Sequence, residues 1–555
     1  MPLFGRGRFF TIVVSAAFCC ALSTPVIAVE QPPNIVVILL DDVDFDEISP
    51  YDFRRMPTFS GALNAGVYPS ARVNFRPIKE PRFFTPTLEA LAREGATFER
   101  FYVTTPACTP SRYSLLTGRY ASRSPAVLAG FDHDEPLNIH FNATLSASEP
   151  NLIRGLSQMG YTTGIVGKWH NGIGGGLGHL RAGEFSRDTK ATDPLLLRRA
   201  RASYEKGVKY LQEVIGFDSA DRIYFGNIKD LHLPDALAHD NLEWITEGAI
   251  SFIQENAERD PPFFLYVALT VPHNQAQARR PFLYRIVKGA HLSKPARANP
   301  LATPIGLLDA IPGGMAPRNT LKSRLEEANA TLGPGAEEML WMDDSIHAIL
   351  KAIDDCGLRS DTFVLVYSDH QTRGKLTVYE GARVPAFARW PGKVEAGRRI
   401  KALSANIDIA PTLLGVAGGE NTTASLNSDG MNLMPLLRGA AQHSRESLLL
   451  EATYQRAIVT SEFKLVVNLE PDWMDRVLNG DHAPGHGFGL VTRSAKHFPA
   501  IGHPVQLYDL GGDVFEQRNI AGLDEYGAEV RVLNERLKKA LEGLPHKESR
   551  FLARD

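Results

Sequence analysis

A cysteine and an arginine stand one helical turn apart in the run Cys108-Thr109-Pro110-Ser111-Arg112. Proline is favoured in the first turn of a helix, so the run predicts a helix that begins near Pro110. Cys108 would lie near the N-terminus of this helix, where free N–H groups and the helix dipole stabilise negative charge. An isolated cysteine in such a place is more often an ordinary small residue in a turn. The run continues, however, as Leu115-Leu116-Thr117-Gly118-Arg119, and the whole string is too specific to be an ordinary turn.

Further ionisable residues follow four segments that are predicted as buried strands, because these segments are continuous aliphatic and β-branched runs. The residues at the strand ends are Asp41 and Asp42 after 34–40, Lys168 and His170 after 163–166, His273 after 263–269, and Asp369, His370 and Lys375 after 362–367. In open α/β sheets, ligands bind outside the carboxyl ends of the strands. Each of these residues alone is structural more often than functional. Their convergence with Cys108 on one sheet edge predicts an active site.

Three aspartates at these strand ends offer ligands for a metal ion. The carboxylate oxygens of Asp41, Asp42 and Asp369 are hard ligands, which suit calcium or magnesium rather than zinc. His370 offers a nitrogen atom, which is a less usual ligand for calcium. Two adjacent aspartates are equally often a helix cap or a turn. The convergence of the three carboxylates favours a cation site.

The elements around these residues indicate an α/β fold with a large, mixed but mostly parallel sheet flanked by helices, because strand-like runs alternate with helical patterns. Further strands are predicted at 97–103 and 387–390, and helices at 85–95, 152–159, 236–256 and 337–353. The paired aspartates at 343–344 and 354–355 lie in or beside the last helix and are predicted to be solvated. Two stretches rich in Arg, Lys, Pro and Gly, at 51–84 and 275–334, are predicted as long loops.

The 555 residues are enough for more than one domain. Arg6 and Arg8, followed by an apolar run at 9–22, predict a secretory signal peptide at 1–28. A catalytic domain is predicted at 33–439. Beyond it, short antiparallel strands and a closing helix at 528–541 predict a smaller α+β domain at 440–555.

Charge and cysteine content narrow the class of partners. The 63 acidic and 60 basic residues give a formal net charge of −3, which argues against a nucleic acid partner. After signal cleavage no segment approaches ~20 apolar residues, so we expect no membrane association. Cys108 and Cys356 are the two cysteines outside the signal. An exported protein without a disulfide framework is most natural in a bacterial envelope, so we expect a secreted or periplasmic protein.

The run from Cys108 to Arg119 resembles the signature of the type I (formylglycine-dependent) sulfatases, in the alkaline phosphatase superfamily. Other blocks that resemble this family lie at 34–42, 160–170, 272–273, 368–385 and 507–510. The resemblance implies an alkaline-phosphatase-like fold and hydrolysis of a sulfate ester. Two short segments depart from the family pattern. Gln371 replaces a glycine in a short loop that leads to Lys375, and residues 43–46 replace a glycine-rich stretch, so we expect an altered pocket shape.

In this family the motif cysteine becomes Cα-formylglycine (3-oxoalanine). The resemblance implies the same fate for Cys108, with a separate maturase as partner. One hydroxyl of the hydrated aldehyde would attack sulfur and expel an alcohol, and collapse of the second hydroxyl to the aldehyde would then release sulfate. The resemblance also implies one Ca²⁺ ion, with ligands from Asp41, Asp42, residue 108, Asp369 and His370.

The charges of the remaining residues predict their roles. Arg112 would hold the formylglycine and the metal-ligand oxygens in place. Lys168 and Lys375 would stabilise the negative charge of the leaving sulfate. His170 suits accepting the proton of the second hydroxyl, and His273 suits protonating the leaving alcohol, although these two roles could be exchanged.

We expect the substrate to be a sulfated carbohydrate or another sulfated small molecule. One alternative is a phosphonate or phosphate diester hydrolase of the same superfamily, which kinetics on paired aryl sulfate and aryl phosphonate esters would distinguish. A less favoured alternative is a non-catalytic glycan-binding relative. The complete set of nucleophile, arginine, lysines and histidines argues against that alternative.

Overall fold

The computed structural model describes Met1 and residues 31–48, 50–51, 83–132, 134–172, 178–235, 237–238, 240–273, 311–330, 332, 335–418, 426–440, 445–479, 488–495 and 497–552. The predicted signal peptide at 1–28, apart from Met1, and most of the predicted loops at 51–84 and 275–334 lie outside the described residues. The chain divides into two units, Met1–Pro32 and Pro33–Asp555. All elements discussed below belong to the second unit.

The larger sheet has eight strands among the described residues, in the order β5-β4-β6-β1-β7-β8-β2-β9. These strands are β1 (Asn34–Leu40), β2 (Ala96–Phe98), β4 (Thr162–Lys168), β5 (Ser219–Tyr224), β6 (Phe263–Ala268), β7 (Thr362–Ser368), β8 (Ala386–Arg389) and β9 (Arg398–Ile400). Neighbouring strands are parallel except where β8 pairs with β7 and β2. The predicted mixed, mostly parallel sheet is therefore confirmed.

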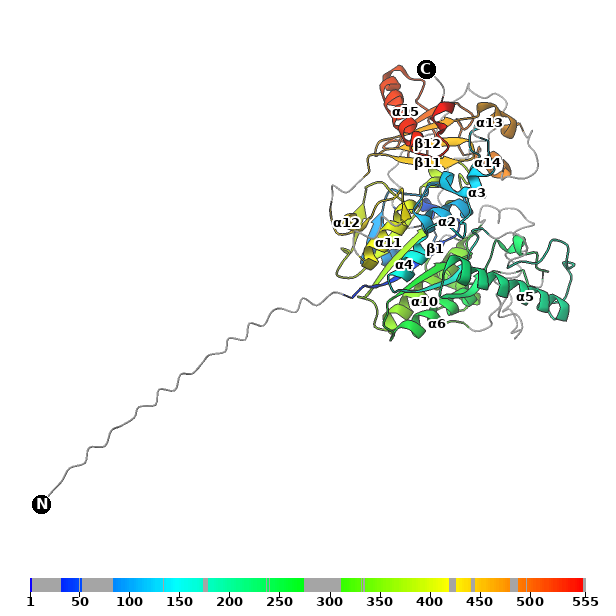
Figure 1. Cartoon of the computed structure of the whole chain (residues 1–555), viewed down its shortest axis with the longest axis vertical. Helices are drawn as coiled ribbons and strands as arrows, with labels where there is room; N and C mark the ends of the chain where they lie inside the picture. The colour runs from blue at the N-terminus through cyan, green and yellow to red at the C-terminus, as the bar shows by residue number, and fades with distance from the viewer. Residues whose placement is uncertain are drawn as a thin grey trace. The chain divides into compact units, whose positions relative to one another are not determined.

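Two groups of helices pack beside this sheet. One contains α1 (Pro86–Glu94), α6 (Leu242–Asn256) and α10 (Ala336–Asp355), and the other contains α2 (Cys108–Thr117), α4 (Leu152–Gln158) and α11 (Ile409–Gly418). Helices α6 and α10 run side by side, and strand β1 lies between the two groups in Figure 1. The further helices are α3 (Pro125–Leu128), α5 (Pro194–Tyr210), α9 (Leu321–Glu327) and α12 (Met434–Leu437).

A second, antiparallel sheet of four strands lies in the C-terminal part of the described residues, as predicted. Its strands are β11 (Leu448–Ala452), β12 (Gln455–Val459), β13 (Phe463–Asn468) and β14 (Val505–Asp509), and the nearby helices are α13 (Pro471–Leu478), α14 (Phe488–Ser494) and α15 (Gly527–Glu542). Leu533, Leu537 and Leu541 repeat every four residues along α15 and form the buried side of this helix. The domain limits at 439 and 440 remain a prediction.

The structure corrects four predictions about local elements. The strand predicted at 97–103 is two strands, because β2 joins the large sheet while β3 (Phe101–Tyr102) pairs with β10 (Ser404–Ala405). The helix predicted near Pro110 already begins at Cys108. The helix predicted from residue 236 begins at Leu242, where the Asn241 side chain caps it. Helix α9 lies within a stretch that was predicted as a loop.

The prediction that residues 343–344 are solvated is also wrong. Asp343 is fully buried, and its carboxylate accepts hydrogen bonds from the backbone N–H groups of Thr87 (2.8 Å) and Leu88 (3.0 Å). These are unpaired donors in the first turn of α1, so Asp343 caps this helix from a distance. Asp344 forms a two-pronged ion pair with Arg324. Asp355 is exposed, as expected.

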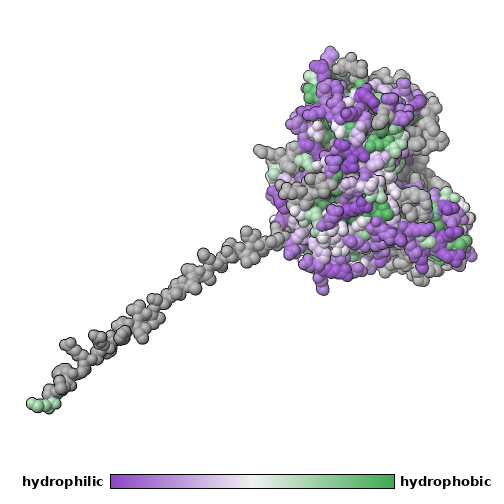
Figure 2. All heavy atoms as spheres, viewed as in Figure 1, coloured by the Kyte–Doolittle hydropathy of each residue, from purple (hydrophilic) through white to green (hydrophobic). Residues whose placement is uncertain are grey.

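The face of the protein that Figure 2 shows is mostly hydrophilic. None of the described helices is both long enough and apolar enough to span a membrane.

Candidate active site

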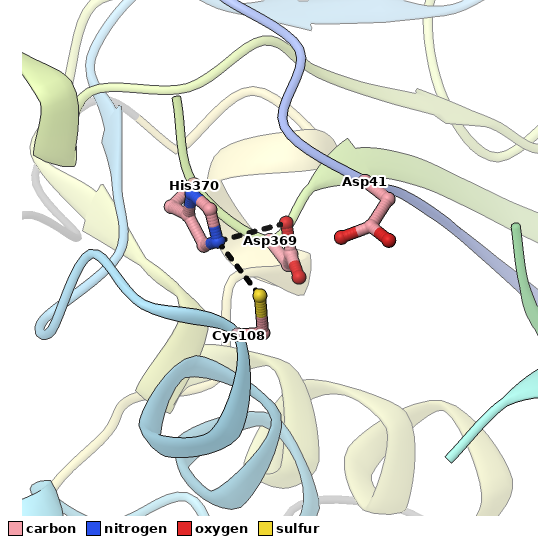
Figure 3. A group of neighbouring side chains, drawn as sticks. All are labelled: Asp41, Cys108, Asp369 and His370. Carbon is pink, nitrogen blue, oxygen red and sulfur yellow. Dashed lines mark hydrogen bonds and ion pairs between the residues drawn. The ribbon is translucent and has the colours of Figure 1, made fainter. Parts of the chain in front are cut away.

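The carboxyl ends of four neighbouring strands, β4, β6, β1 and β7, meet the N-terminus of α2. The structure brings together there all the residues that the sequence singled out, which are Asp41, Asp42, Cys108, Arg112, Lys168, His170, His273, Asp369, His370 and Lys375. Four of them are drawn in Figure 3, where their side chains point toward one another. The convergence of strand ends therefore produces a single cluster.

Cys108 is the first residue of α2, so its thiol lies at the positive end of a helix. Its Sγ atom is 3.4 Å from Nζ of Lys375, 3.8 Å from Nζ of Lys168 and 3.2 Å from Nε2 of His370. Burial opposes ionisation of the thiol, but these positive charges hold the pKa of Cys108 well below its ordinary value. This position stabilises an anion.

The carboxylate of Asp41 points to a cation site. Its Oδ2 accepts a hydrogen bond of 2.7 Å from Lys168, whereas its buried Oδ1 has no hydrogen-bond partner among the described residues. Burial, which outweighs the opposing charge of Lys168, raises the pKa of Asp41 well above its ordinary value. Ligand atoms of Asp41, Cys108, Asp369 and His370 lie within 4.8 Å of one another. Among the described residues, Oδ1 of Asp41 has only an ion-pair contact of 3.7 Å with Nη2 of Arg112. A buried oxygen without a hydrogen bond among such donors fits a metal ion.

His370 and Asp42 complete the negative side of the cluster. The Nε2 atom of His370 is 3.0 Å from Oδ1 of Asp42 and 3.7 Å from Oδ1 of Asp369. Burial opposes a charge on the imidazole, yet the nearby carboxylates raise the pKa of His370 to about 9. The surroundings of Nε2 therefore attract a cation.

Arg112 connects three of the converging elements. Its Nη1 donates to the backbone carbonyl oxygen of Lys168 at 2.7 Å and lies 3.4 Å from the Tyr266 hydroxyl, while its Nη2 donates to Oδ2 of Asp369 at 3.1 Å. The guanidinium is completely buried. Because its planar fork holds several oxygens at once, Arg112 can keep Asp369 oriented toward the cluster.

The two lysines each pair with one aspartate. Lys168 donates to Oδ2 of Asp41, and Lys375 is 3.1 Å from Oδ1 of Asp42. Desolvation opposes both ammonium charges, but the carboxylates and the thiol of Cys108 raise both lysine pKa values. Both side chains therefore stay positively charged beside the thiol.

Unlike His370, the other two histidines of the cluster, His170 and His273, stay neutral at pH 7. Burial lowers the pKa of His170, and burial together with the charge of Lys168 lowers the pKa of His273 to about 4. Both imidazoles interact with the Cys108 thiol, and Nε2 of His273 is also 3.9 Å from Oδ2 of Asp42. Neutral imidazoles next to a nucleophile are suited to proton transfer.

A family model described as Sulfatase matches residues 33–419, well over half of the chain. The chain belongs to the sulfatase family. It is 25% identical to mouse N-acetylgalactosamine-6-sulfatase, over 96% of this chain and 91% of that protein. The chain is thus a sulfuric ester hydrolase.

Solved structures show the same fold. The yidJ protein from Bacteroides fragilis has a TM-score of 0.57 and 18% identity to this chain. The match covers 95% of this chain and 99% of that protein. A protein solved in complex with its substrate D-glucosamine-2-N,6-O-disulfate has a TM-score of 0.53 and 17% identity, with coverage of 94% and 98%.

Two buried asparagines that support the cluster are not among the residues predicted from the sequence. Asn171 is buried, accepts from the backbone N–H of Leu145 at 2.7 Å and donates to the carbonyl oxygen of Thr109 at 3.0 Å. Asn406 is also buried, and its Nδ2 donates to the carbonyl oxygen of Ser111 at 3.1 Å. Both asparagines hold the first turn of α2. Asn171 directly follows the block at 160–170 that resembles the family, which is a usable signal, whereas nothing in the local sequence marks Asn406.

Proposed function

We propose that this sulfatase releases inorganic sulfate from a sulfated carbohydrate, with a formylglycine made from Cys108 as nucleophile and one Ca²⁺ ion as cofactor. The observation that carries the proposal is the position of Cys108. Its side chain lies at a helix N-terminus, between two buried lysines and beside a group of carboxylates. A sulfate group needs such a concentration of positive charge.

The Sγ atom of Cys108 stands in for the oxygens of a hydrated formylglycine at this position. The hydrate supplies two hydroxyls, one for attack on sulfur and one whose collapse expels sulfate. Lys168 and Lys375 hold positive charge next to the reacting centre, where charge on the sulfate oxygens develops. The helix N-terminus adds N–H groups that favour the same charge.

Asp41, Asp42, Asp369 and His370 would hold the metal ion together with residue 108. Oδ1 of Asp41, which accepts no hydrogen bond from the described residues, and the mostly oxygen donor set support calcium rather than zinc. When bound, the ion would supply a fixed positive charge that favours negative charge on the sulfate oxygens and on the nucleophile. Arg112 keeps the carboxylate of Asp369 oriented for this role.

The two histidines would move the protons. His170 accepts the proton of the second hydroxyl, since its lowered pKa keeps the imidazole neutral. His273 protonates the leaving alcohol, because its Nε2 atom lies 3.9 Å from the Asp42 carboxylate, which favours the protonated imidazole needed for this step. Their shared contact with the thiol supports these roles.

The relatives favour a carbohydrate substrate. The mouse relative is named for a sulfated amino sugar, and one structural neighbour was solved with a sulfated glucosamine. The signal peptide predicted at 1–28 supports a secreted or periplasmic protein that meets extracellular glycans. A separate maturase would act on Cys108 before or during folding.

Mass spectrometry of the peptide that contains Cys108 tests the nucleophile. Conversion to formylglycine is expected to lower the peptide mass by about 18 Da relative to the unmodified cysteine peptide. Unmodified thiol throughout protein from the native host contradicts the proposal. Rates on matched aryl sulfate and aryl phosphonate esters test the reaction, and a strong preference for the phosphonate would overturn the assignment of a sulfate substrate.

A further inference from the structure

The two segments that depart from the family pattern, 43–46 and 371–375, lie against each other beside the cluster. The backbone N–H of Thr372 donates to Oδ1 of Asp44 at 2.6 Å. The hydroxyl of Thr372 donates to the backbone carbonyl oxygen of Asp42 at 2.9 Å. Segments more than 300 residues apart in sequence are thus joined next to a proposed metal ligand.

Arg373 makes the strongest connection between the two segments. Its Nη2 lies 2.8 Å from Oδ1 of Asp46, its Nη1 lies 3.6 Å from Oδ2 of Asp44, and its Nε donates to Oε1 of Glu380. The side chain of Arg373 is 10% exposed, and the three carboxylates are 6% exposed or less. One buried guanidinium from the second segment therefore holds two acidic groups of the first segment together with Glu380, in the fork geometry that arginine provides.

Aromatic rings enclose this network. The guanidinium of Arg373 lies over the ring of Phe515, at 5.7 Å from its centroid. Phe515 stacks on Phe45 with the ring centroids 6.2 Å apart. The guanidinium of Arg383 lies over the ring of Phe45, at 4.8 Å from its centroid. Each cation thus rests on an aromatic face, which limits its movement.

The path of the second segment is tight. Gly374 has a φ of +76°, and a Cβ atom there would come within 3.0 Å of the Cα of Gly381. A Cβ atom on Gly381 would lie only 2.2 Å from the backbone oxygen of Arg373. The backbone around Arg373 therefore has little freedom, and a shift of its side chain must also shift the neighbouring residues.

We propose that Arg373 is a positioning residue that holds Lys375 against Asp42. Arg373 is two residues from Lys375, and Asp44 is two residues from Asp42. Lys375 in turn lies 3.1 Å from Oδ1 of Asp42 and 3.4 Å from Sγ of Cys108. Asp42 adopts a left-handed backbone with a φ of 65°, which the hydrogen bond from Thr372 to its carbonyl oxygen helps to maintain. This inference rests on the proposed roles of Asp42 and Lys375.

The variant Arg373→Lys tests the inference, because it keeps the positive charge and loses the planar fork. A matched control is Arg456→Lys, since Arg456 is another completely buried arginine and makes two 2.8 Å bonds to Glu548 within the C-terminal part. Both substitutions are expected to lower the thermal unfolding temperature. Asp46→Asn is the milder variant, because it weakens one contact and leaves Arg373 in place.

Two measurements separate positioning from a merely structural role. Amide hydrogen exchange in peptides that cover 371–376 is expected to be several-fold faster in Arg373→Lys than in the wild type, and unchanged in Arg456→Lys. The kcat for an aryl sulfate is expected to fall between roughly 10- and 100-fold in Arg373→Lys with little change in KM, and to stay constant in the control. Asp46→Asn should also speed up hydrogen exchange and lower kcat, but by smaller factors than Arg373→Lys.

Equal exchange and equal kcat in Arg373→Lys and Arg456→Lys would overturn the inference, and so would faster exchange with an unchanged kcat. A wrong assignment of the proposed function would give a result that differs from both of these outcomes. In that case the wild-type protein itself releases no sulfate, while hydrogen exchange still decides whether Arg373 holds the loop that carries Lys375.

Discussion

The Nδ1 atom of His370 makes a hydrogen bond of 2.8 Å with the backbone carbonyl oxygen of Gln371. A carbonyl oxygen can only accept, so Nδ1 carries the proton. The other ring nitrogen, Nε2, faces the thiol and the carboxylates of the cluster. The hydrogen bond to Gln371 therefore determines which atom of His370 is available to a metal ion.

This orientation predicts a difference between two amide replacements of His370. In His370→Gln the amide reaches about as far as Nε2, whereas in His370→Asn it ends near the position of Nδ1. We expect Ca²⁺ affinity to change little in the glutamine variant and to fall by roughly tenfold or more in the asparagine variant. Isothermal titration calorimetry on the unmodified protein measures both. Tighter binding by the asparagine variant would contradict the assignment of Nε2.

Calcium should stabilise the fold through Asp41. A ligand present at 100 times its Kd adds about 2.7 kcal/mol to the free energy of unfolding. We therefore expect calcium to raise the unfolding temperature of the wild type, and a chelator to reverse this shift. The shift should vanish in Asp41→Asn. The shift should persist in the control Asp343→Asn, because this carboxylate is equally buried but caps α1. Loss of the shift in both variants would argue against a calcium site at Asp41.

The proposed acid role of His273 predicts a dependence on the leaving group. A good leaving group such as 4-nitrophenol departs without a proton, whereas a sugar alcohol needs one. His273→Ala should therefore reduce kcat/KM by roughly 100-fold or more for a sugar sulfate and far less for 4-nitrophenyl sulfate. If His170→Ala shows this selectivity instead, the two histidines have exchanged roles. Equal losses on both substrates would leave neither histidine as the acid.

Glu451 makes the stability of the protein depend on pH. Its Oε1 accepts a bond of 2.8 Å from the backbone N–H of Ser122, and its buried Oε2 has no hydrogen-bond partner among the described residues. Burial raises the pKa of Glu451 to about 7, above its value in the unfolded chain. The folded state thus keeps a proton that the unfolded state releases between about pH 4.5 and 7, and stability falls as pH rises through this window.

The variant Glu451→Gln imitates the protonated carboxyl group and should lack this loss. Urea unfolding at pH 4.5 and pH 8 measures the difference in unfolding free energy between the variant and the wild type. Relative to the wild type, the variant should be more stable at pH 8 than at pH 4.5 by about 3 kcal/mol. This figure is the shift of the Glu451 pKa from 4.5 to about 7, at about 1.4 kcal/mol for each pKa unit. A constant difference at both pH values would show that Glu451 ionises freely in the folded protein.

Much of the fold could be predicted from hydrophobic patterns. The runs that became β1, β6 and β7 are apolar at nearly every position, and the structure buries these strands almost completely. Their register and neighbours could not be predicted this way, since an apolar run does not encode its partner strand. For the same reason the segment at 97–103 looked like one strand, although its two halves join different sheets.

The sequence by itself determined the chemistry of the cluster, because a nucleophile, carboxylates, lysines and histidines stand where predicted strands and a helix end. Local patterns suffice for this, since the end of a strand follows from its own residues. Tertiary structure decided the pairings, such as Lys375 with Asp42, which are 333 residues apart. It also decided that Asp343 caps a distant helix and that Oδ1 of Asp41 accepts no hydrogen bond from the part of the chain that the structure describes. Burial and pairing depend on what other segments place around an atom, which no local pattern contains.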